Sequence, residues 1–144
     1  YVFYYKYNGV LIKLAFLNLI MNTEKINWQF VSVLNFLTII YLSFFIMPGS
    51  DEFSPIIPHL DKIGHFILYG FQAVSLSMYF RKYFFENPNT IVFTICLIVG
   101  VIIEFSQPVL TNNRVFDFLD IIANLSGVLT SLIILKLLIK KRDK

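Results

Sequence analysis

Four runs of apolar residues, each close to the length of a membrane-spanning helix, dominate this chain. They cover residues 28–47, 63–80, 90–105 and 118–139. A helix crosses a hydrocarbon core about 30 Å thick with roughly 20 residues, and its backbone groups are hydrogen-bonded within the segment. Because these runs lack polar–apolar alternation, they indicate helices rather than barrel strands. The second and third runs are short, so we expect them to lie flatter or to sit in a locally thin bilayer.

The composition points to the same class of protein. Of 144 residues, 57% are hydrophobic and only 15% are charged, which is too little polar surface to cover a soluble domain. We therefore predict an all-α, polytopic membrane protein with a bundle of four transmembrane helices. Residues 21–144 are expected to form a single domain, and residues 1–20 a non-native leader or an interfacial segment. The single Cys96 excludes an internal disulfide framework.

Lysine and arginine predict the orientation of the helices. They concentrate in the N-terminal flank, in the turn after the second run and in the C-terminal tail, which follows the positive-inside rule if both termini are cytoplasmic. The residues concerned are Lys6, Lys13, Lys25, Arg81, Lys82, Lys136, Lys140, Lys141, Arg142 and Lys144. The two outer loops then hold Lys62 and Arg114 against a larger number of acids. A bacterial cytoplasmic (inner) membrane is the predicted location.

Polar residues gather at the outer ends of the last three runs. Asp61, His65, Tyr69 and Gln72 share one helical face of the second run. Glu104 and Gln107 lie one turn apart in the third run, and Asp117, Asp120, Asn124 and Gly127 follow one face of the fourth run. An ionised side chain facing lipid costs on the order of 2.5–3.5 kcal/mol, so these stripes should face one another. Small residues at four-residue spacing, such as Gly127 with Ser131, are compatible with close helix contacts.

This expected convergence predicts a functional site. The candidate catalytic groups are His65, Glu104 and Asp120, and the candidate binding groups are Asp61, Lys62, Tyr69, Gln107, Arg114, Asp117 and Asn124. Arg114 and Lys62 suit an anionic head group, while His65 and Glu104 suit an acid–base pair. A membrane lipid or a lipid-linked wall precursor is the expected partner, and the site either binds it or acts on it.

Other interpretations of the same residues stay open. The polar residues can form a structural network that packs the helices, or belong to a small transporter, although the inner halves of the runs offer few polar groups for a path. The cofactor is unknown. His65 and the acids offer divalent-metal ligands, but no diagnostic spacing such as His-Glu-x-x-His occurs, so no metal ligand is assigned. Nothing supports nucleic-acid binding, since the basic tail is explained by topology and anionic lipid.

Three motifs, DKIGHFILYG, EFSQ and RVFDFLDIIANLSG, occur in this order and together resemble the VanZ-like family of small bacterial membrane proteins. The family pattern is matched at Asp61, Lys62, His65, Phe66, Tyr69, Glu104, Gln107, Arg114, Asp117, Asp120, Asn124 and Gly127. The resemblance covers residues 28–139, and the loop TNNR lacks the Pro-Gly often found before the arginine of the family. The resemblance implies a role in the cell envelope and a link to glycopeptide resistance, notably to teicoplanin.

Overall fold

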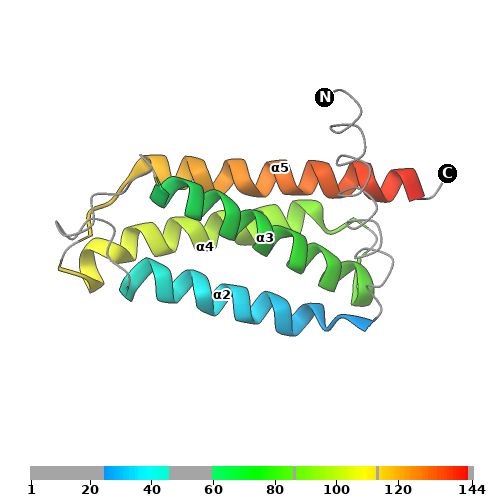
Figure 1. Ribbon diagram of the computed structural model, residues 1–144, viewed down its shortest axis with the longest axis horizontal. Helices are drawn as coiled ribbons and strands as arrows, with labels where there is room; N and C mark the ends of the chain where they lie inside the picture. The colour runs from blue at the N-terminus through cyan, green and yellow to red at the C-terminus, as the bar shows by residue number, and fades with distance from the viewer. Residues whose placement is uncertain (1–24, 46–59, 86, 113, 143–144) are drawn as a thin grey trace, which may run out of the picture.

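The computed structural model describes residues 25–45, 60–85, 87–112 and 114–142, which form four α-helices (Figure 1). They are α2 (Trp28–Phe45), α3 (Leu60–Tyr83), α4 (Asn89–Leu110) and α5 (Phe118–Arg142). The all-α prediction with four long helices is therefore confirmed. The segment 1–20 and the outer loop before residue 60 lie outside the described residues.

Helices α3 and α4 are longer than their apolar runs suggest. α3 has 24 residues and α4 has 22, so at about 1.5 Å per residue both exceed 30 Å. α3 extends through its charged ends because Asp61 lies in its first turn while Arg81 and Lys82 lie in its last turn, where each sign of charge suits the helix dipole. α4 continues through Pro108 to Leu110. The expectation of two short spans is therefore wrong.

The four helices run antiparallel to their chain neighbours and form one elongated bundle (Figure 1). The most extensive contact is between α3 and α5, and α3 also packs along α2. One end of the bundle thus collects the last turn of α2, the first turn of α3, the last turn of α4 and the first turn of α5 (Figure 1). The polar residues singled out above lie toward this end, which we call the polar end.

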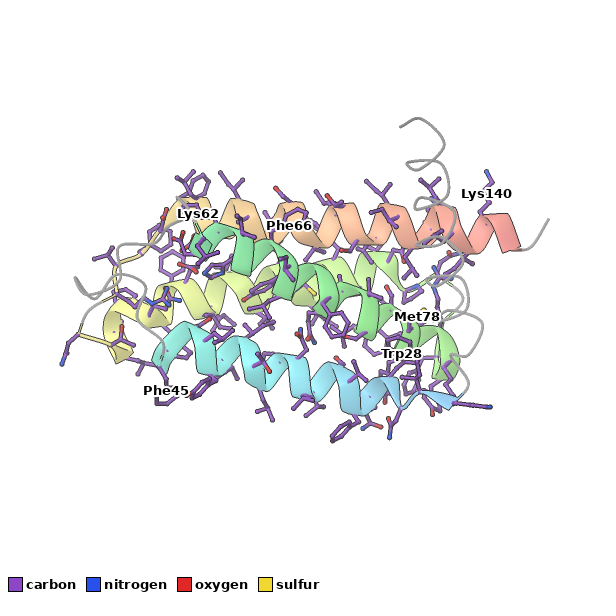
Figure 2. All side chains as sticks on the ribbon, viewed as in Figure 1. Trp28, Phe45, Lys62, Phe66, Met78 and Lys140 are labelled. Atoms are coloured by element: carbon purple, nitrogen blue, oxygen red, sulfur yellow. The ribbon has the colours of Figure 1, made fainter. Side chains whose placement is uncertain are left out.

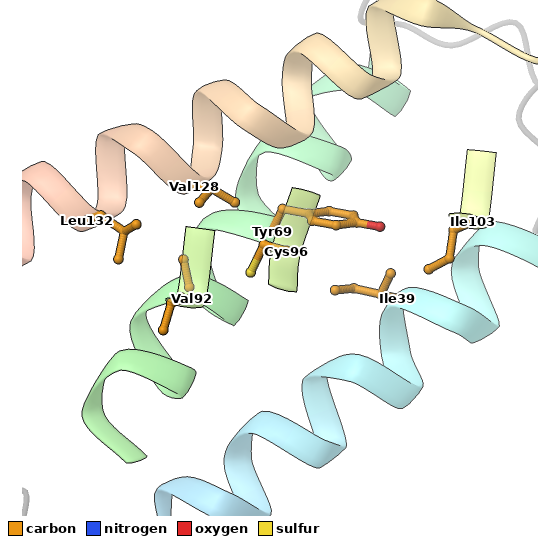
Figure 3. Close-up of a cluster of buried hydrophobic side chains, with 8 residues drawn as sticks. Ile39, Tyr69, Val92, Cys96, Ile103, Val128 and Leu132 are labelled. Atoms are coloured by element: carbon orange, nitrogen blue, oxygen red, sulfur yellow. The ribbon is translucent and has the colours of Figure 1, made fainter. Parts of the chain in front are cut away.

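The core is apolar and lies along the bundle axis. Its main cluster includes Ile39, Tyr69, Val92, Cys96 and Val128, from all four helices (Figure 3). A second cluster of Trp28, Met78 and Leu135 joins α2, α3 and α5 at the opposite end, where Figure 2 labels Trp28 and Met78.

The surface between the two ends is that of a membrane protein. α2, α4 and residues Phe118–Lys140 of α5 are long and apolar enough to cross a bilayer. Large apolar side chains such as Phe30, Leu37 and Leu137 face outward, whereas Ser75, Ser77 and Gln72 are buried. This distribution suits lipid, which can cover apolar side chains but cannot satisfy polar ones. α3 does not belong to this apolar group by composition, and its polar residues Gln72, Ser75 and Ser77 are buried in the bundle.

Candidate functional site

Lys62 stands at the centre of an ion cluster at the polar end. Its ammonium group donates to Asp117 Oδ2 at 2.6 Å, to Asp120 Oδ1 at 2.9 Å and to Asp61 Oδ2 at 3.1 Å. One lysine of α3 is thereby bound to two acids that begin α5. Charge-assisted bonds of this length are the strong class of hydrogen bond, so the cluster fixes the first turns of α3 and α5 together.

Asp117 also caps the N-terminus of α5. Its Oδ1 accepts a bond from the backbone N–H of Leu119 at 2.8 Å, which satisfies one of the donors left free in the first turn of a helix. The hydrogen bond from Lys62, helped by the Leu119 N–H, holds the pKa of Asp117 below its ordinary value. The carboxylate therefore stays charged well into acid.

His65 connects this cluster to the interior. Its Nδ1 lies 3.0 Å from Oδ1 of Asn124, and its Nε2 lies 3.6 Å from Oδ2 of Asp120. The imidazole ring also stacks near the ring of Tyr69, one turn further along α3, with 6.4 Å between ring centroids. The spacing predicted for one face of α3 thus brings His65 against the predicted face of α5.

Glu104 completes the inner part of the site from α4. Its side chain is fully buried, and neither carboxylate oxygen has a hydrogen-bond partner within 3.5 Å, although the backbone of Asp117 and the guanidinium of Arg114 both act favourably on the carboxylate. One ligand atom each of His65, Glu104 and Asp120 lie within 4.8 Å of one another. The hydroxyl of Tyr69 and Nδ2 of Asn124 are also buried without a partner. Three helices therefore direct polar atoms into one small region, as the sequence predicts.

Gln107 and Arg114 contact a different element, the end of α2. Nε2 of Gln107 donates to the carbonyl of Ser43 at 3.4 Å, and Nη2 of Arg114 donates to the carbonyl of Leu42 at 3.3 Å. These carbonyls belong to the last turn of α2, which lacks partners of its own. The two predicted binding residues therefore anchor α2 to the polar end.

A close contact between backbones sets the spacing of α3 and α5. A β-carbon on Gly127 would overlap the carbonyl of Phe66, and one on Gly70 would lie 2.7 Å from the Ser131 hydroxyl. Only glycine allows such an approach, and small residues at this spacing are typical of membrane helix pairs. The predicted contact through Gly127 and Ser131 is confirmed, and it brings Asp120 and Asn124 within reach of Lys62 and His65.

Among known protein families, the VanZ/LLP1 model matches residues 4–139, which include α2, α3, α4 and most of α5. The chain belongs to the VanZ/LLP1 family. The predicted resemblance to VanZ-like proteins is therefore confirmed, and the three motifs quoted above converge at the polar end of this family member. No curated protein and no solved structure matches the chain.

This VanZ/LLP1 protein also contains a buried polar group that the sequence analysis missed. Asn35 of α2 donates to Oε1 of Gln72 at 2.7 Å and to the carbonyl of Leu68 at 3.1 Å. Gln72 in turn donates to the hydroxyl of Ser32 at 2.9 Å. Ser32 and Asn35 are spaced like one helical face, which was the signal available, but the surrounding residues of α2 are apolar enough to hide it. These satisfied bonds join α2 to α3.

Beside this group, α2, α3 and α4 line a half-open cavity of about 230 Å³. Most of its lining is apolar, including Val33, Phe36 and Ile95. Tyr69 and Gln72 also line it, so the wall of the cavity includes a residue that packs on His65. The side chain of Tyr69 therefore separates the apolar cavity from His65 at the polar end.

Proposed function

We propose that this VanZ/LLP1 protein binds the polar head group of an amphiphile at the outer surface of the bacterial cytoplasmic membrane, while the apolar tail stays in the bilayer. The observation that carries the proposal is Glu104, a fully buried carboxyl group with no hydrogen-bond partner on either oxygen. Buried polar groups in proteins are nearly always paired, and an unpaired one costs about 1–3 kcal/mol or more. A ligand that pairs with Glu104 removes this cost.

The alternative is a purely structural network that holds the helices together. A structural network is expected to leave no buried polar group without a partner. The groups bonded to Lys62 and to Asn35 fit this expectation. The group around Glu104 does not, because Tyr69 and Asn124 also leave buried atoms unpartnered there. We therefore assign the Lys62 cluster to scaffolding and the region between His65, Glu104 and Asn124 to ligand binding.

The orientation rests on the distribution of basic residues. Lys25, Arg81, Lys82 and Lys140 lie toward the end opposite Lys62, and Figure 2 labels Lys140 and Lys62 at the two ends of the bundle. By the positive-inside rule, the basic end is cytoplasmic and the polar end is outside. In this proposal α3 is the second of four spans and both termini are cytoplasmic.

The surroundings of the site suit an amphiphile. The cavity beside Tyr69 is lined mainly by apolar side chains and can take part of a tail. Arg114 lies at the polar end and donates to the carbonyl of Leu42, and a guanidinium is the side chain best suited to a two-point contact with a phosphate or carboxylate. A lipid-linked wall precursor has this combination of tail and charged head group, which agrees with the envelope role implied by the family.

The test combines stability with bound lipid. We expect Glu104→Gln, measured in detergent with EDTA, to keep or raise the melting temperature, because it replaces a buried carboxyl group that has no hydrogen-bond partner with a group that cannot ionise. The same substitution should lower the amount of co-purifying lipid found by mass spectrometry. Arg114→Lys should lower the bound lipid as well, since lysine lacks the planar two-point grip. Lys136→Gln, on the exposed face of α5 toward the other end, is the matched control and should change neither.

The same variants should be tested for glycopeptide susceptibility in cells that produce the protein. If Glu104→Gln lowers the melting temperature clearly and leaves the bound lipid unchanged, the cluster is structural and the proposal is wrong.

A further inference from the structure

His65, Glu104 and Asp120 come from α3, α4 and α5 and share one buried region. One nitrogen or carboxylate oxygen from each lies within 4.8 Å of the other two. The side chains of His65 and Asp120 are 11% and 6% exposed, and Glu104 is fully buried. The region is therefore enclosed, and its three ligand-type groups are fixed on separate helices.

The bonds of His65 determine what its inner nitrogen can do. Nδ1 lies 3.0 Å from Oδ1 of Asn124, and because an amide oxygen only accepts, Nδ1 is the donor. In the neutral imidazole Nε2 then carries a lone pair, which faces Oδ2 of Asp120 at 3.6 Å. Two lone-pair atoms turned toward each other need a proton or a cation between them. A second-sphere acceptor on the other ring nitrogen is the usual arrangement of a metal-binding histidine.

The two carboxylate oxygens of Asp120 face different partners. Oδ1 accepts the bond from Lys62 at 2.9 Å, which leaves Oδ2 facing His65. Lys62 thereby holds the carboxylate in the orientation that presents Oδ2 to the interior. Asp61 and Asp117 are not available for a metal ion in the same way. The Lys62 ammonium already lies between their carboxylates.

The charge of the polar end favours a divalent cation. Four carboxyl groups, those of Asp61, Glu104, Asp117 and Asp120, face the two cations Lys62 and Arg114. When all four are ionised, they exceed these two cations by two charges among the described residues of the polar end. Glu104, which has no hydrogen-bond partner, is the carboxyl group with both oxygens available. One divalent ion between Glu104, Asp120 and His65 would compensate the excess.

From this geometry we infer a divalent transition-metal site formed by Nε2 of His65, Oδ2 of Asp120 and the carboxylate of Glu104. An imidazole with two carboxylates suits ions such as Zn²⁺ better than Ca²⁺ or Mg²⁺, which prefer oxygen ligands alone. Zinc bonds of about 2.0–2.1 Å place tetrahedral ligands roughly 3.3 Å apart, and the His65–Asp120 separation of 3.6 Å is close to this value. The inference deepens the proposed function, since the open coordination position would take the anionic part of the head group.

The test measures zinc on the tag-free full-length protein in detergent. After treatment with EDTA and return to micromolar free Zn²⁺, we expect one ion per chain by mass spectrometry and a higher melting temperature than without metal. Co²⁺ in place of Zn²⁺ should give the visible absorption bands of a low-symmetry site. His65→Ala and Glu104→Gln should weaken zinc binding at least 100-fold, and Asn124→Ala about 10-fold to 100-fold.

Lys136→Gln, on the exposed face of α5 toward the other end, is the matched control and should keep its zinc affinity. Variants are compared after size-exclusion chromatography in EDTA, so that loss of fold is not mistaken for loss of metal. The inference is overturned if wild type holds no stoichiometric zinc, or if both His65→Ala and Glu104→Gln keep it. Lipid that co-purifies with a protein unable to bind zinc would leave the head-group proposal standing, while zinc binding without any lipid would leave only the metal site.

Discussion

The carbonyl of Phe66 on α3 lies where a β-carbon on Gly127 of α5 would have to be. The two helix backbones touch at this point, directly after His65 on α3 and one turn after Asn124 on α5. Because Gly127 also matches the family pattern, the contact gives that position a physical reason: it sets the distance across which Lys62 reaches Asp120. The geometry of the site thus depends on a residue that has no functional group.

Gly127→Ala should therefore destabilise the protein by about 1–3 kcal/mol or more, since the added methyl group meets backbone that cannot move without separating α3 and α5. Gly64 is the matched control, because a β-carbon there has no neighbour within 4 Å. Gly64→Ala should be neutral or slightly stabilising, as alanine is the better helix former. Thermal unfolding in detergent measures both. Equal melting temperatures for the two variants would contradict the close contact.

Lys62→Met should lower stability at neutral pH by on the order of 2 kcal/mol, because three carboxylates lose their common donor. The sign of the pH dependence follows from Asp117, whose pKa is lowered by Lys62 from the ordinary value of 3.8. Its contribution is complete above that value and is lost as the pH falls through the lowered pKa. Wild type should therefore lose stability below about pH 4, and the gap to Lys62→Met should narrow. Unfolding curves of wild type and Lys62→Met at pH 7 and pH 3 measure the difference in stability. An equal difference at the two pH values argues against this prediction.

Asn35 and Gln72 should behave as a coupled pair. Asn35→Leu leaves Oε1 of Gln72 buried and unpaired and should cost about 1–3 kcal/mol. In the double variant Asn35→Leu/Gln72→Leu, both partners become apolar, so the total cost should be smaller than the sum of the two single costs. Bound zinc should stay as in wild type, because neither residue is an inferred zinc ligand. Simple additivity of the three melting experiments would refute the coupling.

Topology can be tested with single cysteines in a Cys96→Ala background. Asn112→Cys, exposed after the end of α4, should react with an impermeant thiol reagent added to intact cells, and Lys140→Cys should react only after the cells are opened. The expected difference follows from the basic residues at the Lys140 end. The reverse labelling pattern would place the polar end in the cytoplasm.

The four helices and the meeting of their polar faces could be predicted from the sequence, for physical reasons. Apolar runs determine helices in a membrane protein, because lipid leaves the backbone no other partner. The one-face spacing of Asp61 with His65, and of Asp120 with Asn124, predicts which side chains meet, since polar faces avoid lipid. The bounds expected for the second and third helices are too short because they follow the apolar runs alone. Charged residues that suit the helix dipole extend α3 at both ends, and α4 continues through Pro108.

The details of pairing could not be read from the sequence. The sharing of Lys62 among three acids depends on a helix separation that Gly127 sets, and one glycine does not reveal its contact. Arg114 and Gln107 were assigned to a ligand on residue type alone, and their bonds to the last turn of α2 follow from how the chain folds back. The unpaired state of Glu104 is likewise a property of the packed bundle.

The polar side chains of α3 point into the bundle, and some of their partners are synthesised only later. When α3 leaves the ribosome, α2 is already present and can pair with Gln72 through Asn35, but Asp120 and Asn124 have not been synthesised. Lys62 and His65 thus enter the translocation machinery without their later partners. α2 and α3 should be inserted as a hairpin that stays loosely held until α5 arrives, so a chain truncated before residue 118 should be a substrate for membrane quality-control proteases.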